Sequence, residues 1–170
     1  VHTYASMYMM DDAARTVRPD GAGLRRTLDS HVLRFYEEGL NAVVTVNSRR
    51  AAPSILNLQV NGKTDASNAD DSHTEILLGA FPLLLHPDPK DILVIGLGSG
   101  ITAGTVTCFP GVTWIDQIEI EQAVVNGARL FAADHHDILR DPESKRVHLH
   151  VARRRRRGSC PARASRSAPA

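Results

Sequence analysis

A continuous apolar run that opens directly into a glycine-rich turn, "DILVIGLGSG" at Asp91–Gly100, constrains the fold of this chain more than any other feature. An uninterrupted apolar segment of this length is typical of a parallel strand that is covered on both faces. Gly96, Gly98 and Gly100 allow a sharp turn and let a ligand lie against the backbone. The helix expected from about Ile101 to Cys108 would present free N–H groups to that ligand. The alternative is a tight strand-to-helix turn without a ligand, but three alternating glycines exceed what a turn requires.

The segments after this turn repeat the order of strand and helix. "VTWIDQIEIE" (Val112–Glu121) is a second strand, "QAVVNGARLFA" (Gln122–Ala132) has the pattern of a helix, and "RVHLHVA" (Arg146–Ala152) begins a third strand. Strands that alternate with helices predict an α/β fold with a doubly wound parallel sheet.

The preceding segment predicts a small antiparallel β lobe instead. "NAVVTVNS" (Asn41–Ser48) is β-branched and apolar, and "SILNLQVNGK" (Ser54–Lys63) alternates apolar and polar residues before an Asn61-Gly62 turn signal. The polar stretch Asp65–Ser72 predicts a loop.

A mostly apolar helix, about His73–Leu85, is expected to connect the lobe to the sheet and to be buried. Ser72 can cap this helix, and Glu75 three residues later would complete a capping box. Pro87 and Pro89 are expected to end it.

Glu119 and Glu121, near the end of the second predicted strand, are candidate ribose ligands. An acid about 20 residues after a glycine turn is where such folds hold ribose hydroxyls, and a carboxylate accepts both in a bidentate way. Glu121 could instead cap the next helix, and both could be solvated strand-end charges. Ile101 stands where a dinucleotide fold prefers a third glycine, and the resulting G-x-G-x-G resembles the loop of class I methyltransferase-like folds, which bind S-adenosylmethionine or its relatives.

The charge of the chain is distributed unevenly. It has 20 Lys and Arg against 19 Asp and Glu, but seven of the arginines lie in residues 153–170, which contain no acid. The remainder is mildly acidic, so a nucleic-acid partner is not expected. No apolar stretch reaches the length of a membrane helix, no secretory signal is evident, and two distant cysteines indicate a reducing, cytoplasmic location. Because the sequence opens with Val1 instead of Met, it is expected to be a fragment or to come from an unusual start codon.

Four segments then carry a family resemblance. "EEGLNAVVTV", "LQVNGKTDAS", "TEILLGAFPLLLHPDPKDILVIGLGSGITAG" and "IEIEQAVVNGARLF" follow in the order and spacing of spermidine synthases, the polyamine aminopropyltransferases. The chain most resembles their bacterial spermidine-synthase-like branch, some of whose members are fused to membrane segments. The resemblance implies decarboxylated S-adenosylmethionine as co-substrate, putrescine or a similar amine as acceptor, no metal, and a possible homodimer. It also implies that Gly96, Gly98, Ser99 and Gly100 cradle the co-substrate and that Glu119 holds its ribose.

The same resemblance places Asp65 near a loop that approaches the co-substrate, but it also exposes departures from the family. Ser99 stands where the family usually carries an aspartate that helps to bind the charged aminopropyl chain. His73-Thr74 replaces Tyr-Gln, Arg153 follows Ala152 where an Asp-Gly is expected, and the later aspartates that deprotonate the amine are absent. Since amine attack needs a positioned base, the catalytic residue is unknown and the chain is expected to be inactive. A methyltransferase-like protein and a non-catalytic nucleoside-binding remnant are the alternatives.

The expected organisation has three parts. Residues 1–85 form the β lobe with its linking helix, residues 86–152 an incomplete Rossmann-like half that binds the nucleoside, and residues 153–170 a disordered basic tail that resembles out-of-frame translation. Trp114 is expected in the core, His135 without a specific role, and His148 and His150 on a strand surface rather than at a metal.

Overall fold

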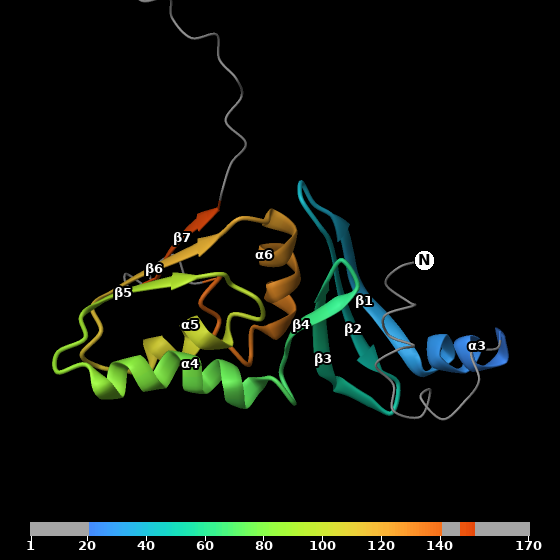
Figure 1. Ribbon diagram of the computed structural model, residues 1–170, viewed down its shortest axis with the longest axis horizontal. Helices are drawn as coiled ribbons and strands as arrows, with labels where there is room; N and C mark the ends of the chain where they lie inside the picture. Colours follow the sequence, from blue (N-terminus) through green and yellow to red (C-terminus); the bar gives the residue numbers. More distant parts are fainter. Residues whose placement is uncertain (1–20, 141–146, 152–170) are drawn as a thin grey trace, which may run out of the picture.

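The computed structural model describes residues 21–140 and 147–151, which form two β-sheets joined by helices (Figure 1). The predicted disorder of residues 153–170 lies outside the described residues. Helix α3 (Gly21–Ser30) leads into an antiparallel sheet in the order β1-β2-β3-β4. Its strands are β1 (His31–Glu38), β2 (Val43–Arg49), β3 (Ala52–Val60) and β4 (Lys63–Ser67). The predicted antiparallel lobe is therefore confirmed.

The turn between β3 and β4 forms where the sequence predicts it. Asn61 and Gly62 both have positive φ, 51° and 83°, which is the geometry that favours Asn-Gly in a tight hairpin. The hairpin continues further than expected, because the first part of the predicted loop Asp65–Ser72 belongs to β4. Ala66 pairs with Leu58 and is buried, so a short strand with one core residue forms despite its polar composition.

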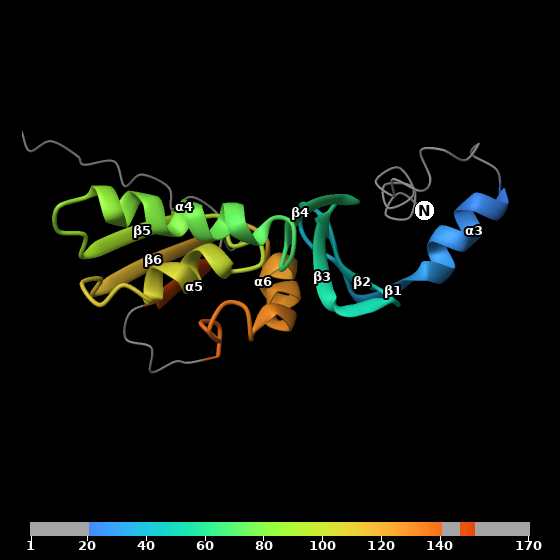
Figure 2. The same cartoon turned by 90° about the horizontal axis from the view of Figure 1, so that it is seen from below.

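The second sheet is parallel, in the order β5-β6-β7. Its strands are β5 (Asp91–Ile95), β6 (Trp114–Glu119) and β7 (Val147–Val151), and the helices are α4 (Ser72–Leu85), α5 (Ile101–Thr107) and α6 (Gln122–Ala128), followed by the 3-10 turn η1 (Arg129–Phe131). Helices α4 and α5 lie together on one face of this sheet, and α6 lies between the two sheets (Figures 1 and 2). The alternation of strands and helices confirms the predicted α/β architecture.

One expectation about β5 is wrong, because this strand is covered on one face only by the described residues. Leu93 and Ile95 are 58% and 77% exposed, and they pair with Asp116 and Ile118 of β6 on the same face. The opposite face carries Ile92 and Val94, which pack against a buried cluster with α4 and α5. A continuous apolar run therefore does not prove that both faces of the strand are covered.

Helix α4 also differs from expectation. Only Gly79 and Leu83 of this helix are buried, and its exposed apolar side chains are Ile76, Leu77, Leu78, Phe81, Leu84 and Leu85. The capping box does not form, because the Ser72 hydroxyl donates to the Ala69 carbonyl and the Glu75 carboxylate accepts from Ser99. The residue that precedes the helix, Asp71, makes no side-chain cap.

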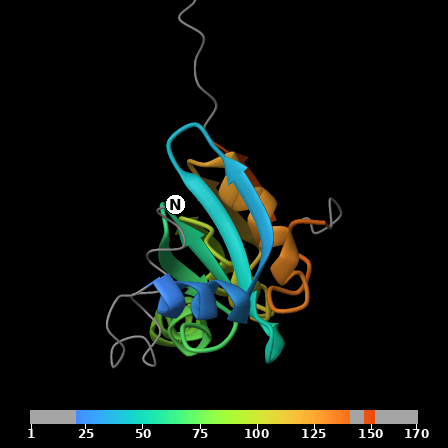
Figure 3. The ribbon, with the colours of Figure 1, turned by 90° about the vertical axis from the view of Figure 1, so that its right-hand side faces the viewer.

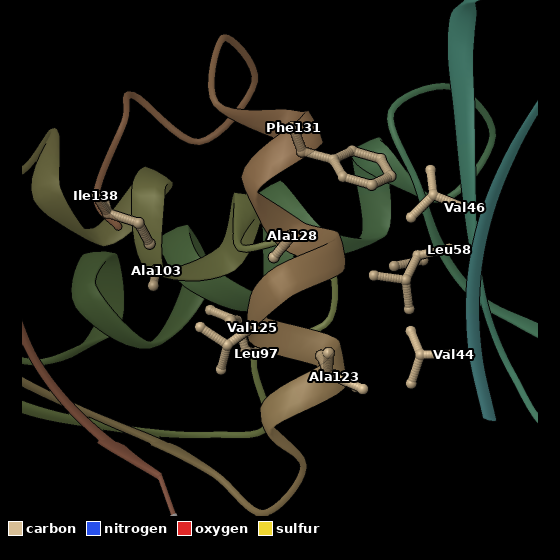
Figure 4. Close-up of a cluster of buried hydrophobic side chains, with 12 residues drawn as sticks. Val44, Val46, Leu58, Leu97, Ala103, Ala123, Val125, Ala128, Phe131 and Ile138 are labelled. Atoms are coloured by element: carbon tan, nitrogen blue, oxygen red, sulfur yellow. The ribbon is translucent and has the colours of Figure 1, made fainter. Parts of the chain in front are cut away.

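The main core lies where α6 and η1 meet the antiparallel sheet. Val44, Val46 and Leu58 of the sheet face Ala123 and Phe131, and all five are fully buried (Figure 4). Figure 3 shows β1 and β2 passing in front of α6 in this arrangement. The two sheets therefore share one hydrophobic core, and the N-terminal lobe is fixed beside the glycine turn.

Candidate functional site

The glycine turn adopts a conformation that only glycine takes without strain. Gly96, Gly98 and Gly100 have φ of 86°, 56° and 89°, in the left-handed region that a Cβ atom disfavours. Gly100 is also the N-cap residue of α5. All three predicted positions are therefore explained by backbone geometry alone, which is compatible with a ligand but does not require one.

Strand β6 holds this turn by three hydrogen bonds. The Gly96 N–H donates to the Ile118 carbonyl at 2.8 Å, and the Gln117 amide Nε2 donates to the Gly96 carbonyl at 2.9 Å. The Leu97 N–H donates to Glu119 Oε2 at 2.9 Å. Gln117 and Glu119 are both buried, so the shape of the turn depends on two buried polar side chains of the neighbouring strand.

Glu119 is only 6% exposed, and most of its hydrogen-bonding capacity is used by the backbone. Its Oε1 accepts from the N–H groups of Ile120 and Glu121 at 2.7 and 2.9 Å, in addition to the Leu97 bond at Oε2. A carboxylate has about four acceptor positions, so about one remains on Oε2. Glu119 therefore anchors the turn, and its role as the ribose ligand stays a prediction.

Glu121 fulfils the capping role that the sequence offered as an alternative. Its carboxylate accepts from the Ala123 N–H at the start of α6, at 3.4 Å, and from the N–H groups of Leu40 and Asn41 at 3.2 and 2.8 Å. Burial acts to raise the pKa of Glu121, but the donors at Asn41, Leu40 and Ala123 leave it below its usual value. This buried residue thus joins the β1–β2 turn to the end of β6.

A different carboxylate, Glu75, lies at the glycine turn. Ser99 is buried, its hydroxyl donates to Glu75 Oε2, and the same hydroxyl accepts from the Ile101 N–H at 3.2 Å. Burial raises the pKa of Glu75, and the hydrogen bond from the Ser99 hydroxyl partly lowers it again. The charge of Asp71 raises this pKa further, and weaker effects come from Ser67, which lowers the pKa, and from Asp134, which raises it. Sequence reasoning treated Glu75 only as a helix cap, because its spacing from Ser72 fits that role.

A cavity of about 870 Å³ extends from the glycine turn along β5. One wall is α4, including Glu75, and the other is β5 with Gly96, Leu97 and Gly98. Asp65 also lines it, and its carboxylate lies 3.2 Å from the Lys63 ammonium. The structure therefore brings Asp65, Gly96 and Gly98 to one cavity, while Ser99, Gly100 and Glu119 are not among its lining residues.

His135 has a defined role, contrary to expectation. It is fully buried, its Nε2 lies 3.1 Å from the Ala128 carbonyl, and its Nδ1 accepts from the Ile138 N–H at 3.2 Å. This pattern requires a neutral ring protonated at Nε2, and burial lowers its pKa. A Cβ atom at Gly100 would lie 3.0 Å from His135 Cδ2. His135 therefore packs directly behind the glycine turn, a contact that its position in a polar stretch does not reveal.

Trp114, His148 and His150 lie on one face of β6 and β7. Trp114 is 43% exposed and stacks on His148 with ring centroids 3.5 Å apart, so the expectation of a core tryptophan is wrong. His150 Nε2 lies 2.7 Å from Asp116 Oδ1, which places both histidines on the strand surface, as expected.

Among the described residues, no group of three or more His, Cys, Asp or Glu is arranged to hold a metal ion. Within the same residues, no helix is long and apolar enough to cross a bilayer.

Parallel strands joined by helices, with a left-handed glycine turn anchored to the end of the next strand, define a Rossmann-like α/β protein. A family model described as the spermine/spermidine synthase domain matches residues 72–153. This match spans α4, the glycine turn and both glutamates, and it agrees with the relatives and folds that follow. Over this segment the chain is similar to the spermine/spermidine synthase family.

Curated relatives agree with this assignment over a similar segment. A polyamine aminopropyltransferase of Streptococcus pneumoniae is 35% identical over 85 residues, which is 50% of this chain and 30% of the relative. A polyamine aminopropyltransferase of Leptospira biflexa is 31% identical over 84 residues, 49% of this chain and 30% of the relative. The chain thus matches about 30% of the length of these relatives.

Solved structures support the fold over a larger part of the chain. A spermidine synthase in complex with the transition state analogue AdoDATO has a TM-score of 0.61 at 22% identity, covering 71% of this chain and 39% of that one. Spermidine synthase from Thermotoga maritima has a TM-score of 0.62 at 21% identity, covering 71% and 41%. The antiparallel lobe followed by a Rossmann-like sheet is therefore the fold of this family.

Proposed function

We propose that this chain forms the co-substrate-binding part of an aminopropyl transfer site, with decarboxylated S-adenosylmethionine as donor and putrescine or a similar amine as acceptor. The observation that carries the proposal is the glycine turn beside the cavity, held by Glu119 at the end of the next strand. The nucleoside would lie against Gly96 and Gly98, where the lack of side chains permits close approach. Gly100 and Ser99 would support the turn from behind.

The four-stranded lobe favours this function over a methyltransferase on the same fold. Helix α6 fixes the lobe beside the turn through a shared core, and Asp65 of β4 reaches the cavity. The lobe thereby supplies one side of the proposed site. We also propose that residues 1–85 form the β lobe with its linking helix, that residues 86–152 form the nucleoside-binding half, and that the protein is cytoplasmic.

The acceptor amine must lose a proton before it attacks the carbon next to sulfur, with methylthioadenosine as the leaving group. The described residues place four carboxylates at the cavity, those of Asp65, Glu75, Asp88 and Asp91. Asp65 and Asp88 lie 3.2 and 2.6 Å from lysine ammonium groups. Because the later aspartates that the family resemblance assigns to amine deprotonation have no counterpart in this sequence, we propose that this chain alone binds the donor without transferring the aminopropyl group. Release of methylthioadenosine at about 1 per second or faster would contradict this.

The experiment that tests donor binding is calorimetry on the purified chain with methylthioadenosine, decarboxylated S-adenosylmethionine, S-adenosylmethionine and NAD. We expect the two aminopropyl-transfer ligands to bind more tightly than NAD. Equal or tighter binding of NAD would overturn the proposal. Tighter binding of S-adenosylmethionine than of its decarboxylated form would favour the methyltransferase-like alternative.

A further inference from the structure

Among the described residues that line the cavity, Glu75 is the one with a buried side-chain oxygen that has no hydrogen-bond partner. Its Oε2 accepts from the Ser99 hydroxyl, whereas the buried Oε1 has no donor in hydrogen-bonding geometry in the part of the chain that the structure describes. The Ser67 backbone lies near enough to lower the pKa of this carboxyl without forming such a bond. A buried carboxylate oxygen without a donor costs about 1–3 kcal/mol or more, which a suitable ligand would recover. Glu75 lines the cavity at its glycine-turn end, so a ligand in the cavity lies beside this side chain.

The other carboxylate at this end of the cavity has a cationic neighbour. Asp65 is exposed, and its Oδ1 lies 3.2 Å from the Lys63 ammonium. No salt bridge to Glu75 forms within residues 21–140 and 147–151. Its half-buried position makes a charge interaction stronger than at the surface. Glu75 is therefore the uncompensated acid beside the turn.

Ser99 holds this carboxylate in one position. Its hydroxyl accepts from the Ile101 N–H and donates to Glu75, so the direction of the bond is determined. The Thr102 hydroxyl also donates to the Glu75 carbonyl at 3.1 Å, which fixes α4 to α5 at this point. A carboxylate held at both its side chain and its backbone is preorganised, and little entropy is lost when a cation binds.

We propose that Glu75 is a specificity-determining residue that recognises a primary ammonium group on the ligand of the glycine turn. An ammonium group supplies N–H donors to the carboxylate and compensates its charge. This inference rests on the proposed function, because it assumes that a nucleoside occupies the turn. It assigns the charge selectivity of the site to helix α4 rather than to the turn itself, where position 99 is a serine.

The test uses two nucleosides that differ only in the terminal group: propylthioadenosine, without an amine, and aminopropylthioadenosine, with one. Their dissociation constants are measured by calorimetry for the native chain, Glu75→Gln and Asp71→Asn. Asp71 precedes the same helix and adds to the local negative charge without lining the cavity. Propylthioadenosine reports whether each variant keeps a folded nucleoside site.

We expect the native chain and Asp71→Asn to prefer the amine by about tenfold or more, the scale of a charged hydrogen bond. Glu75→Gln should lose this preference and bind propylthioadenosine within about twofold of the native chain, since the amide oxygen can still accept from the Ser99 hydroxyl. If Glu75→Gln prefers the amine as strongly as the native chain does, or if the native chain shows no such preference, the role of Glu75 is overturned while the proposed function stands. Failure of both nucleosides to bind the native chain would overturn the proposed function and this inference with it.

Discussion

The backbone N–H of Leu97 and the buried carboxylate of Glu119, separated by 22 residues in the sequence, are joined by a 2.9 Å hydrogen bond. This bond fixes the glycine turn to the end of β6, and Glu119 accepts two further backbone N–H groups there. Any ligand that binds Glu119 must therefore share the carboxylate with the turn. The nucleoside site and the fold depend on the same side chain.

Glu119→Gln should weaken nucleoside binding by roughly 1–3 kcal/mol, the scale of a lost charged hydrogen bond. The neutral amide also replaces an acceptor oxygen by a donor, so we expect a lower midpoint of thermal unfolding. Calorimetry with methylthioadenosine and a thermal melt measure the two effects. Glu121→Gln is the matched control, and it should affect binding less; the reverse order would identify Glu121 as the ribose ligand.

Glu121 should matter chiefly for the attachment of the β1–β2 turn. Its carboxylate accepts from Leu40 and Asn41 while it caps α6. Glu121→Ala removes these acceptors and should cost about 2–4 kcal/mol of unfolding free energy, the sum of a lost cap and buried donors. Urea unfolding measures this. Gln122→Ala, at the exposed next position, should cost less than about 0.5 kcal/mol, and a similar loss in both variants would contradict the assignment.

The glycines of the turn should respond differently to the same substitution. Gly96 and Gly100 have nearly equal φ, but a Cβ at Gly96 would meet no atom within 4 Å, whereas one at Gly100 would lie 3.0 Å from His135. Gly96→Ala should therefore cost about 1–2 kcal/mol from backbone strain alone, and Gly100→Ala about 1–3 kcal/mol more from overpacking. Chemical denaturation compares them. Equal losses would show that His135 moves freely.

Stability should depend on pH through His135. Burial lowers its pKa in the folded state, so the unfolded chain binds a proton first as the pH falls. The contribution of the neutral ring is thus fully present above about pH 6.5, the unfolded value, and is lost as the pH falls below it. Unfolding free energies measured between pH 8 and 5 should show this slope. His135→Gln should reduce the slope, and His136→Gln, at the exposed neighbour, should retain it.

The sequence predicts the parts of this fold that are locally encoded. Asn61-Gly62 forms a turn because of its own backbone preference. The glycine turn forms because its glycines lack Cβ atoms. The sequence does not reveal that Glu75 bonds to Ser99 or that His135 lies behind Gly100, because both contacts join segments that only the tertiary structure brings together. The burial of α4 is mispredicted for the same reason: apolar residues around a helix do not specify what covers them.

The exposed apolar side chains of α4 predict self-association of the purified chain. Phe81, Leu84 and Leu85 are 54%, 71% and 78% exposed, and a contiguous apolar surface of this kind favours association. Phe81→Lys combined with Leu84→Lys should lower the apparent mass in light scattering, because neither residue lines the cavity and charge disfavours apolar contact. Leu130→Lys, on η1 at 37% exposure, is the control and should leave association unchanged. An equal reduction by the control would mean that net charge, and not the α4 surface, controls association; binding of methylthioadenosine by the double variant would show that its fold is intact.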